Sequence, residues 1–225
     1  MSSSSAPVPV LTYFNVPGRG EIARLLFTIG KVDFEDKQVV FEEWGALKPT
    51  TPFGQIPILQ VGDTVAAQSA AIDHYAAKLA GLQPQDPLQA LLVDQTYYFV
   101  TSDIHTALIS PTAKLAGEEQ LKARQALSAP GGPLKSKLAQ LEKLVAGRSG
   151  KFIVGEQLSL ADLSVFNFLG MLKSGFWAGI PADVASDFPA LTVFRNQIAS
   201  LPEIAAYYAA ATDELRVKGY RSDEA

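Results

Sequence analysis

The chain of 225 residues contains no cysteine, and this absence excludes several kinds of chemistry. Without cysteine the protein forms no disulfide, binds no metal through thiolates and has no cysteine nucleophile. Only two histidines are present, His74 and His105, so a histidine metal site or a histidine-containing catalytic triad is not expected. We therefore expect no metal cofactor.

Basic clusters and long apolar runs are also missing. The net charge is -4, the pI is about 5.2, and basic residues do not gather in runs, so we expect neither nucleic acid nor a membrane as a partner. No run of about 18 apolar residues occurs, which excludes a membrane-spanning helix. The first ten residues lack the charged and apolar regions of a signal peptide. With 48% hydrophobic and 19% charged residues, the chain is predicted to be globular and cytoplasmic.

Residues 8–29 read as a strand, a tight turn and a helix. Val8 to Phe14 is an apolar and β-branched run typical of a buried strand, and residues 15–18 (NVPG) have turn chemistry. Tyr13 stands at the end of the strand beside the start of the helix, either as a donor to a bound anion or simply as a strand aromatic. The helix is predicted from apolar residues that recur on one face: Ile22, Leu25, Leu26 and Ile29.

The alternation of strands and helices continues to residue 81. A strand-helix-strand unit implies a parallel pair of strands, and a hairpin adds antiparallel ones. We therefore predict an α/β thioredoxin-like domain with a mixed four-stranded sheet over residues 1–81, with Ser69 capping its last helix. The further segments are a second strand, a short helix or irregular segment, a hairpin and the last helix: Asp33–Val40, Phe41–Lys48, Ile56–Val61 with Thr64–Ala67, and Gln68–Leu79.

A proline-bearing connector at residues 82–87 is the best domain boundary, and no strand signal follows it. We predict an all-α domain over residues 88–225, with a charged, loose tail after Leu215. Residues 159–162 (SLAD) resemble a capping box ahead of another helix. The long first helix of this domain is predicted from an apolar stripe: Val93, Tyr97, Val100, Ile104 and Leu108.

Four motifs follow one another in the first domain. They are Tyr13 before Gly18-Arg19, Trp44 with Lys48, residues 53–58 (FGQIPI), and Gln68-Ser69 opening a helix. With the all-helical second half, this order resembles a cytosolic glutathione S-transferase, most of all the sigma class with its glutathione-dependent prostaglandin D synthases, in which the first strand ends Tyr-Phe-Asn. The resemblance implies glutathione as cosubstrate, a homodimer, and a hydrophobic electrophile bound by the second domain.

The resemblance also implies roles for single residues. Tyr13 donates its hydroxyl hydrogen to the glutathione sulfur, which lowers the thiol pKa, and Arg19 supports the site around it. Gln68 and Ser69, at a helix N-terminus, offer donors to the γ-glutamyl carboxylate. The Ile56–Pro57 bond is expected to be cis, so that the Ile56 backbone pairs with the cysteinyl part. The full set of expected glutathione contacts is Phe14, Arg19, Trp44, Lys48, Gln55, Ile56, Pro57, Gln68 and Ser69.

Two other functions stay open: a non-catalytic structural or ligand-carrying protein, and a glutathione-dependent isomerase. Family members commonly place an acidic residue where this chain has Ser102, with Asp103 next to it, to reach the partner subunit's glutathione. Aspartates linked to metal activation in some prostaglandin synthases correspond to Tyr98, Thr101 and Ser102, which argues against that assignment. One polar stripe could line the electrophile cleft, the dimer groove or the surface: Asp94, Tyr98, Thr101 and His105.

Overall fold

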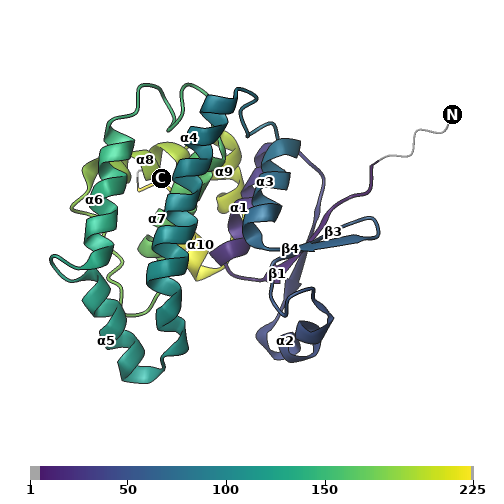
Figure 1. The fold of residues 1–225 in the computed structure, drawn as a ribbon, viewed down its shortest axis with the longest axis horizontal. Helices are drawn as coiled ribbons and strands as arrows, with labels where there is room; N and C mark the ends of the chain where they lie inside the picture. The colour runs from purple at the N-terminus through teal and green to yellow at the C-terminus, as the bar shows by residue number, and fades with distance from the viewer. Residues whose placement is uncertain (1–5, 224–225) are drawn as a thin grey trace. The chain divides into compact units, whose positions relative to one another are not determined.

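The computed structural model describes residues 6–223 and falls into two compact units, Met1–Leu82 and Gln83–Ala225 (Figure 1). The first unit is an α/β structure and the second is built from helices. Among the described residues, no helix is both long and apolar enough to cross a membrane.

The first unit is organised around a four-stranded sheet of order β2-β1-β3-β4. β1 (Val10–Phe14) and β2 (Glu35–Val39) run parallel because α1 (Glu21–Ile29) carries the chain between them. β3 (Ile58–Val61) pairs antiparallel with β1 and with β4 (Thr64–Ala67), which gives the predicted hairpin. The predicted thioredoxin-like fold with its mixed sheet is confirmed.

The strand register brings three segments of the chain to one edge of the sheet. Thr12, near the end of β1, lies opposite Ile58, the first residue of β3. Ala67, the last residue of β4, also lies opposite Ile58. The residues that follow β1, precede β3 and follow β4 therefore meet at this edge.

The helices of the first unit differ from expectation in two places. α3 (Ser69–Leu79) begins at Ser69, so Gln68 and not Ser69 is the N-cap residue, and the prediction for Ser69 is wrong. α1 is buried at every residue from Glu21 to Phe27, whereas the sequence predicted one apolar face. In Figure 1, α1 and α3 lie together on one side of the strands, and α2 (Phe41–Leu47) lies on the other. Two short 3₁₀ turns complete the unit: Gly18–Gly20 and Lys48–Thr50.

The second unit is packed around α7 (Leu160–Ser174), in which every residue except Lys173 is buried. Such a helix needs partners on all sides. α4 (Pro87–Tyr98), α8 (Pro189–Ala199) and α10 (Glu214–Tyr220) pack against it. The all-helical prediction for the second half is confirmed. The other helical elements of this unit are Phe99–Ile109, Ser110–Lys114, Gly117–Ser128, Pro133–Ala146 and Pro202–Ala209.

Residues 216–220 lie in α10, so the prediction of a loose tail is wrong for this part, while residues 224–225 lie outside the described residues. Tyr220 is fully buried and donates its hydroxyl hydrogen to Asn167 Oδ1 on α7 over 2.8 Å. Arg216 is 5% exposed and pairs with Asp213 Oδ2 at 2.9 Å, so its charge is neutralised locally. The sequence analysis predicted a loose segment from its charged composition, which does not reveal these two contacts.

α4 continues into η3 (Phe99–Ile109), an 11-residue π-helix. A π-helix places more residues in each turn than an α-helix, so the buried face shifts along the sequence. After Ile104 the next fully buried residue is Ile109, five positions on, while Leu108 is only half-buried. The predicted stripe is therefore correct up to Ile104 and wrong at Leu108.

The predicted capping box at the start of α7 is confirmed. Asp162 Oδ2 accepts hydrogen bonds from the Ser159 backbone N–H at 2.8 Å and from its hydroxyl at 2.7 Å. Asp162 Oδ1 accepts a third, from the Ile153 N–H at 2.8 Å, which ties the preceding loop to the helix. Burial raises the pKa of Asp162 to about 6. The hydrogen bonds favour the charged carboxylate and lower this pKa, but burial has the larger effect.

Asp162 is expected to stabilise the fold more at low pH than at neutral pH. Its folded pKa lies above the ordinary value, so the folded state binds the proton more tightly, and the contribution declines as pH rises from about 4 to about 6. Two pKa units correspond to at most about 3 kcal/mol. Urea unfolding between these pH values gives the free energy of unfolding of wild type and of Asp162→Asn. The difference between the two proteins should become smaller as pH rises. A difference that grows with pH contradicts a raised pKa of Asp162.

Candidate active site

Tyr13, at the end of β1, lies under the glycine-rich turn that leads into α1. Its side chain is 8% exposed, and its hydroxyl oxygen accepts a hydrogen bond from the Arg19 backbone N–H at 3.1 Å. A Cβ added to Gly18 would come within 2.7 Å of that hydroxyl, and one added to Gly20 within 2.5 Å of the ring. The turn therefore fits closely over the ring because these two positions lack side chains.

The surroundings keep Tyr13 protonated. Burial raises the pKa of the Tyr13 phenol above its usual range, although the Arg19 hydrogen bond and the charges of Arg19 and Arg24 act in the opposite direction. A neutral phenol whose oxygen already accepts from a backbone amide can donate its own hydrogen to an anion. The expected support from Arg19 thus includes its backbone amide as well as its charge.

Arg24, which the sequence analysis did not select, fixes the turn between β1 and α1. Its guanidinium is fully buried, lies 5.6 Å from the centroid of the Tyr13 ring, and donates to the carbonyl oxygens of Phe14 at 3.0 Å and Val16 at 2.9 Å. Its Nε atom donates to both carboxylate oxygens of Asp36 on β2, at 3.0 and 3.1 Å. One side chain therefore ties the end of β1, the turn and β2 together.

The signal that could have identified Arg24 is its spacing from Glu21. These residues stand three apart in an otherwise apolar helix and form an ion pair of 3.2 Å, with both side chains 0% exposed. Opposite charges three apart on a helix face each other. Charges are almost never fully buried unless they are paired.

The edge of the sheet next to Tyr13 carries two further expected residue pairs. The Ile56–Pro57 peptide bond directly before β3 is cis, as predicted. Gln68, directly after β4, has φ 75°, a conformation that non-glycine residues rarely adopt and that often marks a functional site. The Gln68 side chain makes no capping hydrogen bond, and the first N–H groups of α3, Ser69 included, point out of the helix end.

α2 places Trp44 against Phe14, and two further expected residues, Lys48 and Gln55, follow this helix. The Phe14 ring lies edge-on to Trp44 at 5.8 Å, and it stacks on Phe41, which the sequence reasoning did not select, at 4.4 Å. Lys48 follows α2 directly, and its Cε would lie 3.6 Å from a Cβ on Gly54, the residue before Gln55. Trp44, Lys48 and Gln55 are thus placed on the same part of the first unit.

The polar stripe of the second unit has partners within that unit. Asp94 accepts a hydrogen bond from Gln83 at 3.1 Å, and the His105 ring lies edge-on to Trp177 at 5.3 Å. Asp103 pairs with Lys137 at 3.2 Å, while Ser102 is exposed. Within residues 6–223, no group of three or more acidic or histidine side chains is arranged to hold a metal ion.

Comparison with known proteins agrees with this architecture in both units. Residues 9–78 match the family model of the glutathione S-transferase N-terminal domain, and residues 102–211 match that of the C-terminal domain. The chain is 35% identical to glutathione S-transferase 1 of Ascaris suum over 200 residues, which cover 88% of this chain and 94% of the relative. It is 32% identical to hematopoietic prostaglandin D synthase of Gallus gallus over 197 residues, covering 88% and 93%.

Solved structures show the same likeness. The crystal structure of the glutathione S-transferase from Ascaris lumbricoides aligns with a TM-score of 0.76 and 31% identity, covering 92% of this chain and 98% of that one. The thioredoxin-like unit, the helical unit and these matches define a transferase of the glutathione-dependent class. The chain belongs to the glutathione S-transferase family and is related to the prostaglandin D synthases within it.

Proposed function

We propose that this protein is a glutathione transferase that ionises the glutathione thiol beside Tyr13 and adds the thiolate to a hydrophobic electrophile. One observation carries the proposal: the buried Tyr13 hydroxyl, fixed by the Arg19 amide, lies at the sheet edge shared with Pro57 and Gln68. The family and its named transferases support conjugation over a non-catalytic role.

Tyr13 acts by favouring the charged form of the sulfur. A free thiol with a pKa near ~8.5 is only a few per cent ionised at pH 7. A donor aimed at the sulfur stabilises the thiolate, and each pKa unit of that shift is about 1.4 kcal/mol. The thiol proton leaves to solvent, the sulfur forms a bond to the electrophilic carbon, and a halide, where present, departs with the bonding electrons. Tyr13 stays protonated throughout, in keeping with its raised pKa.

The rest of the expected set binds the peptide part of glutathione. Gln68 and Ser69 stand at the N-terminus of α3, where N–H groups and the helix dipole favour the γ-glutamyl carboxylate. Lys48, with Trp44 and Gln55, supplies charge and contact for the glycyl end. Ile56 offers its backbone, next to β3, to the cysteinyl part.

The electrophile, the location and the assembly form part of the same proposal. Residues 88–225 supply the electrophile site, with the stripe that includes Tyr98 as its first candidate wall. The protein works in the cytoplasm as a homodimer. Exposed apolar side chains support the dimer, because such groups gather at interfaces: Phe53 is 65% exposed, Leu88 65% and Leu91 61%.

The test is conjugation of glutathione to an activated aryl chloride, together with calorimetric measurement of glutathione binding. Turnover that depends on both reactants supports the transferase. Glutathione binding without turnover of any electrophile would leave a non-catalytic binding protein. Turnover of a prostaglandin endoperoxide far above that of the aryl chloride would instead identify the isomerase.

Replacing Gly18 with alanine is expected to lower kcat by about tenfold or more, because the new Cβ displaces the Tyr13 hydroxyl. Gly81→Ala is the matched control. Both glycines have positive φ, 53° and 68°, but nothing lies within 4 Å of a Cβ at Gly81. Thermal melts should show a loss of stability from the positive φ in both variants, with a further loss in Gly18→Ala from the contact with Tyr13. Steady-state kinetics should show a loss of kcat only in Gly18→Ala. Equal kcat in the two would remove the steric link to Tyr13.

Leu91→Glu is expected to convert the dimer to a monomer, since a charge in an apolar interface is strongly unfavourable. Val193→Glu is the control, because Val193 is 62% exposed on α8 and lies outside the proposed interface. Light scattering after size exclusion measures the mass. If Leu91→Glu stays dimeric at micromolar concentration, α4 does not form the interface.

A further inference from the structure

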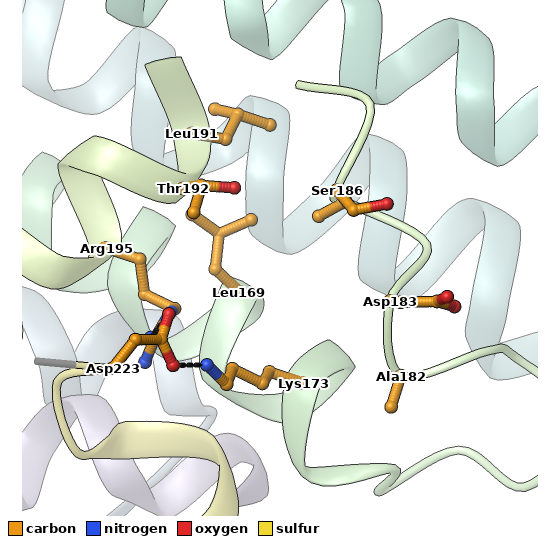
Figure 2. Close-up of a pocket in the computed structure, with 10 residues that line it drawn as sticks. Leu169, Lys173, Ala182, Asp183, Ser186, Leu191, Thr192, Arg195 and Asp223 are labelled. Carbon is orange, nitrogen blue, oxygen red and sulfur yellow. Dashed lines mark hydrogen bonds and ion pairs between the residues drawn. The ribbon is translucent and has the colours of Figure 1, made fainter. Parts of the chain in front are cut away.

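A cavity of about 380 Å³ opens on the surface of the second unit, and its lining contains no residue of the proposed glutathione site. α7 and α8 form one wall, and the segment 182–186 forms the wall opposite (Figure 2). Asp223 stands at one end of the cavity, where Figure 2 shows its carboxylate between Arg195 and Lys173. The volume falls within the ~300–1,000 Å³ typical of small-molecule sites.

The charged end of the cavity has two cations and one carboxylate. Asp223 pairs with Arg195 through Oδ2 at 2.7 Å and with Lys173 through Oδ1. The Arg195 side chain is 4% exposed, and its Nη1 also donates to the carbonyl oxygens of Gly219 at 3.1 Å and Arg221 at 2.9 Å. Arg195 is therefore fixed in place, and the three groups together carry one net positive charge.

Lys173 differs from Arg195 because it is accessible and holds fewer bonds. Its side chain is 33% exposed, and it is the one residue of α7 that is not buried. An ammonium group has three hydrogens to donate, and Asp223 needs one of them. Burial is the main cause that lowers the pKa of Lys173, and repulsion by the nearby Arg195 cation lowers it further. A second carboxylate beside Lys173 would relieve that repulsion.

The remainder of the cavity is mainly apolar. Leu169 and Leu191 come from the helical wall, and Ala182 and Ala185 come from the opposite segment. The other acidic side chain of the lining, Asp183, is exposed and points away from the charged end in Figure 2. Water screens an exposed charge of this kind, so it weakens the positive potential at Lys173 only slightly.

We propose that this cavity binds a small apolar monocarboxylate, whose charged group contacts Lys173 while its hydrocarbon chain lies against Leu169 and Leu191. On binding, Asp223 keeps its ion pair with Arg195, and its ion pair with Lys173 is replaced by one between Lys173 and the ligand carboxylate. The exchange costs little free energy, because the Asp223 side chain is 41% exposed and water can solvate the carboxylate oxygen that Lys173 leaves. This site goes beyond the proposed transferase activity, and its lining contains no residue of the proposed glutathione set or of the stripe that includes Tyr98.

Octanoate is the probe, and 1-octanol, which has the same chain without the charge, is its control. Calorimetry on the full chain should show octanoate binding at least about tenfold more tightly than octanol, the difference expected of a hydrogen bond to a charged group. Lys173→Met should remove this preference. Asp223→Asn should tighten octanoate binding several-fold, because the competing carboxylate is gone. Lys122→Met, at an exposed pair with Glu118 elsewhere in the unit, should change nothing.

Thr192→Trp tests the location, since Thr192 is an exposed lining residue and a large ring there fills the cavity. Octanoate binding should be lost in this variant, while glutathione conjugation stays at the wild-type rate. Octanoate binding that survives in Thr192→Trp, or that is equal in wild type and Lys173→Met, would overturn the proposal. Equal affinity for octanoate and octanol would do the same.

Discussion

Replacing Tyr13 with phenylalanine is expected to lower kcat/KM for glutathione conjugation by about one hundredfold, with little change in glutathione affinity. The lost group is one hydrogen-bond donor to a developing negative charge, and removing such a donor costs about 10²–10³ in rate. The ring remains, so the packing beneath Gly18 and Gly20 is kept. The apparent pKa of the bound thiol, read from the pH dependence of kcat/KM and from thiolate absorption, should rise by about one to two units.

Tyr75→Phe is the matched control for this experiment. Tyr75 is 39% exposed on α3, and its hydroxyl lies outside the proposed site, so neither the rate nor the pH profile should change. A reading of Tyr13 as only a strand aromatic makes a different prediction, namely equal activity in the phenylalanine variant. If the rate falls but the thiol pKa stays constant, Tyr13 would position glutathione without ionising it.

The first unit was largely predictable because its signals are local. A β-branched run, a turn and a periodic helix stand in sequence order at residues 8–29, and the hairpin closes within residues 58–67. The error at Ser69 arose at a helix boundary, where serine is a common cap. Gln68 takes that position with φ 75°, and only the backbone dihedral reveals it.

The missed features depend on partners that are distant in the sequence. Arg24 is buried because Asp36, 12 positions away, accepts its Nε hydrogen, and Tyr220 is buried because Asn167, 53 positions away, accepts its hydroxyl. Periodicity reports only which face of one helix is apolar, so it gave no role to Arg24 and did not identify Tyr220 as buried. The π-helix misplaced Leu108 for a similar reason, since the period itself changed.

Arg24→Met is expected to destabilise the protein by about 3–5 kcal/mol, the usual cost of removing one partner from a buried ion pair. The variant loses the Arg24 cation that faces the fully buried Glu21 carboxylate. It also loses the donors to the carbonyl oxygens of Phe14 and Val16, which hold the turn above Tyr13. Urea unfolding followed by circular dichroism measures the loss, and kcat should fall in the same variant at temperatures where it remains folded.

The double variant Arg24→Met with Glu21→Gln separates charge from shape. Removing the carboxylate's charge as well should recover at least about 1 kcal/mol of the stability, because the cost of burying an anion without its Arg24 partner disappears. Catalysis should not recover, since the two carbonyl contacts of Arg24 are still missing. Arg24→Lys should fall between wild type and Arg24→Met, because one ammonium cannot span Asp36, Phe14 and Val16 as a planar guanidinium does. A double variant no more stable than Arg24→Met would show that the donors, and not the ion pair, carry the stability of this turn.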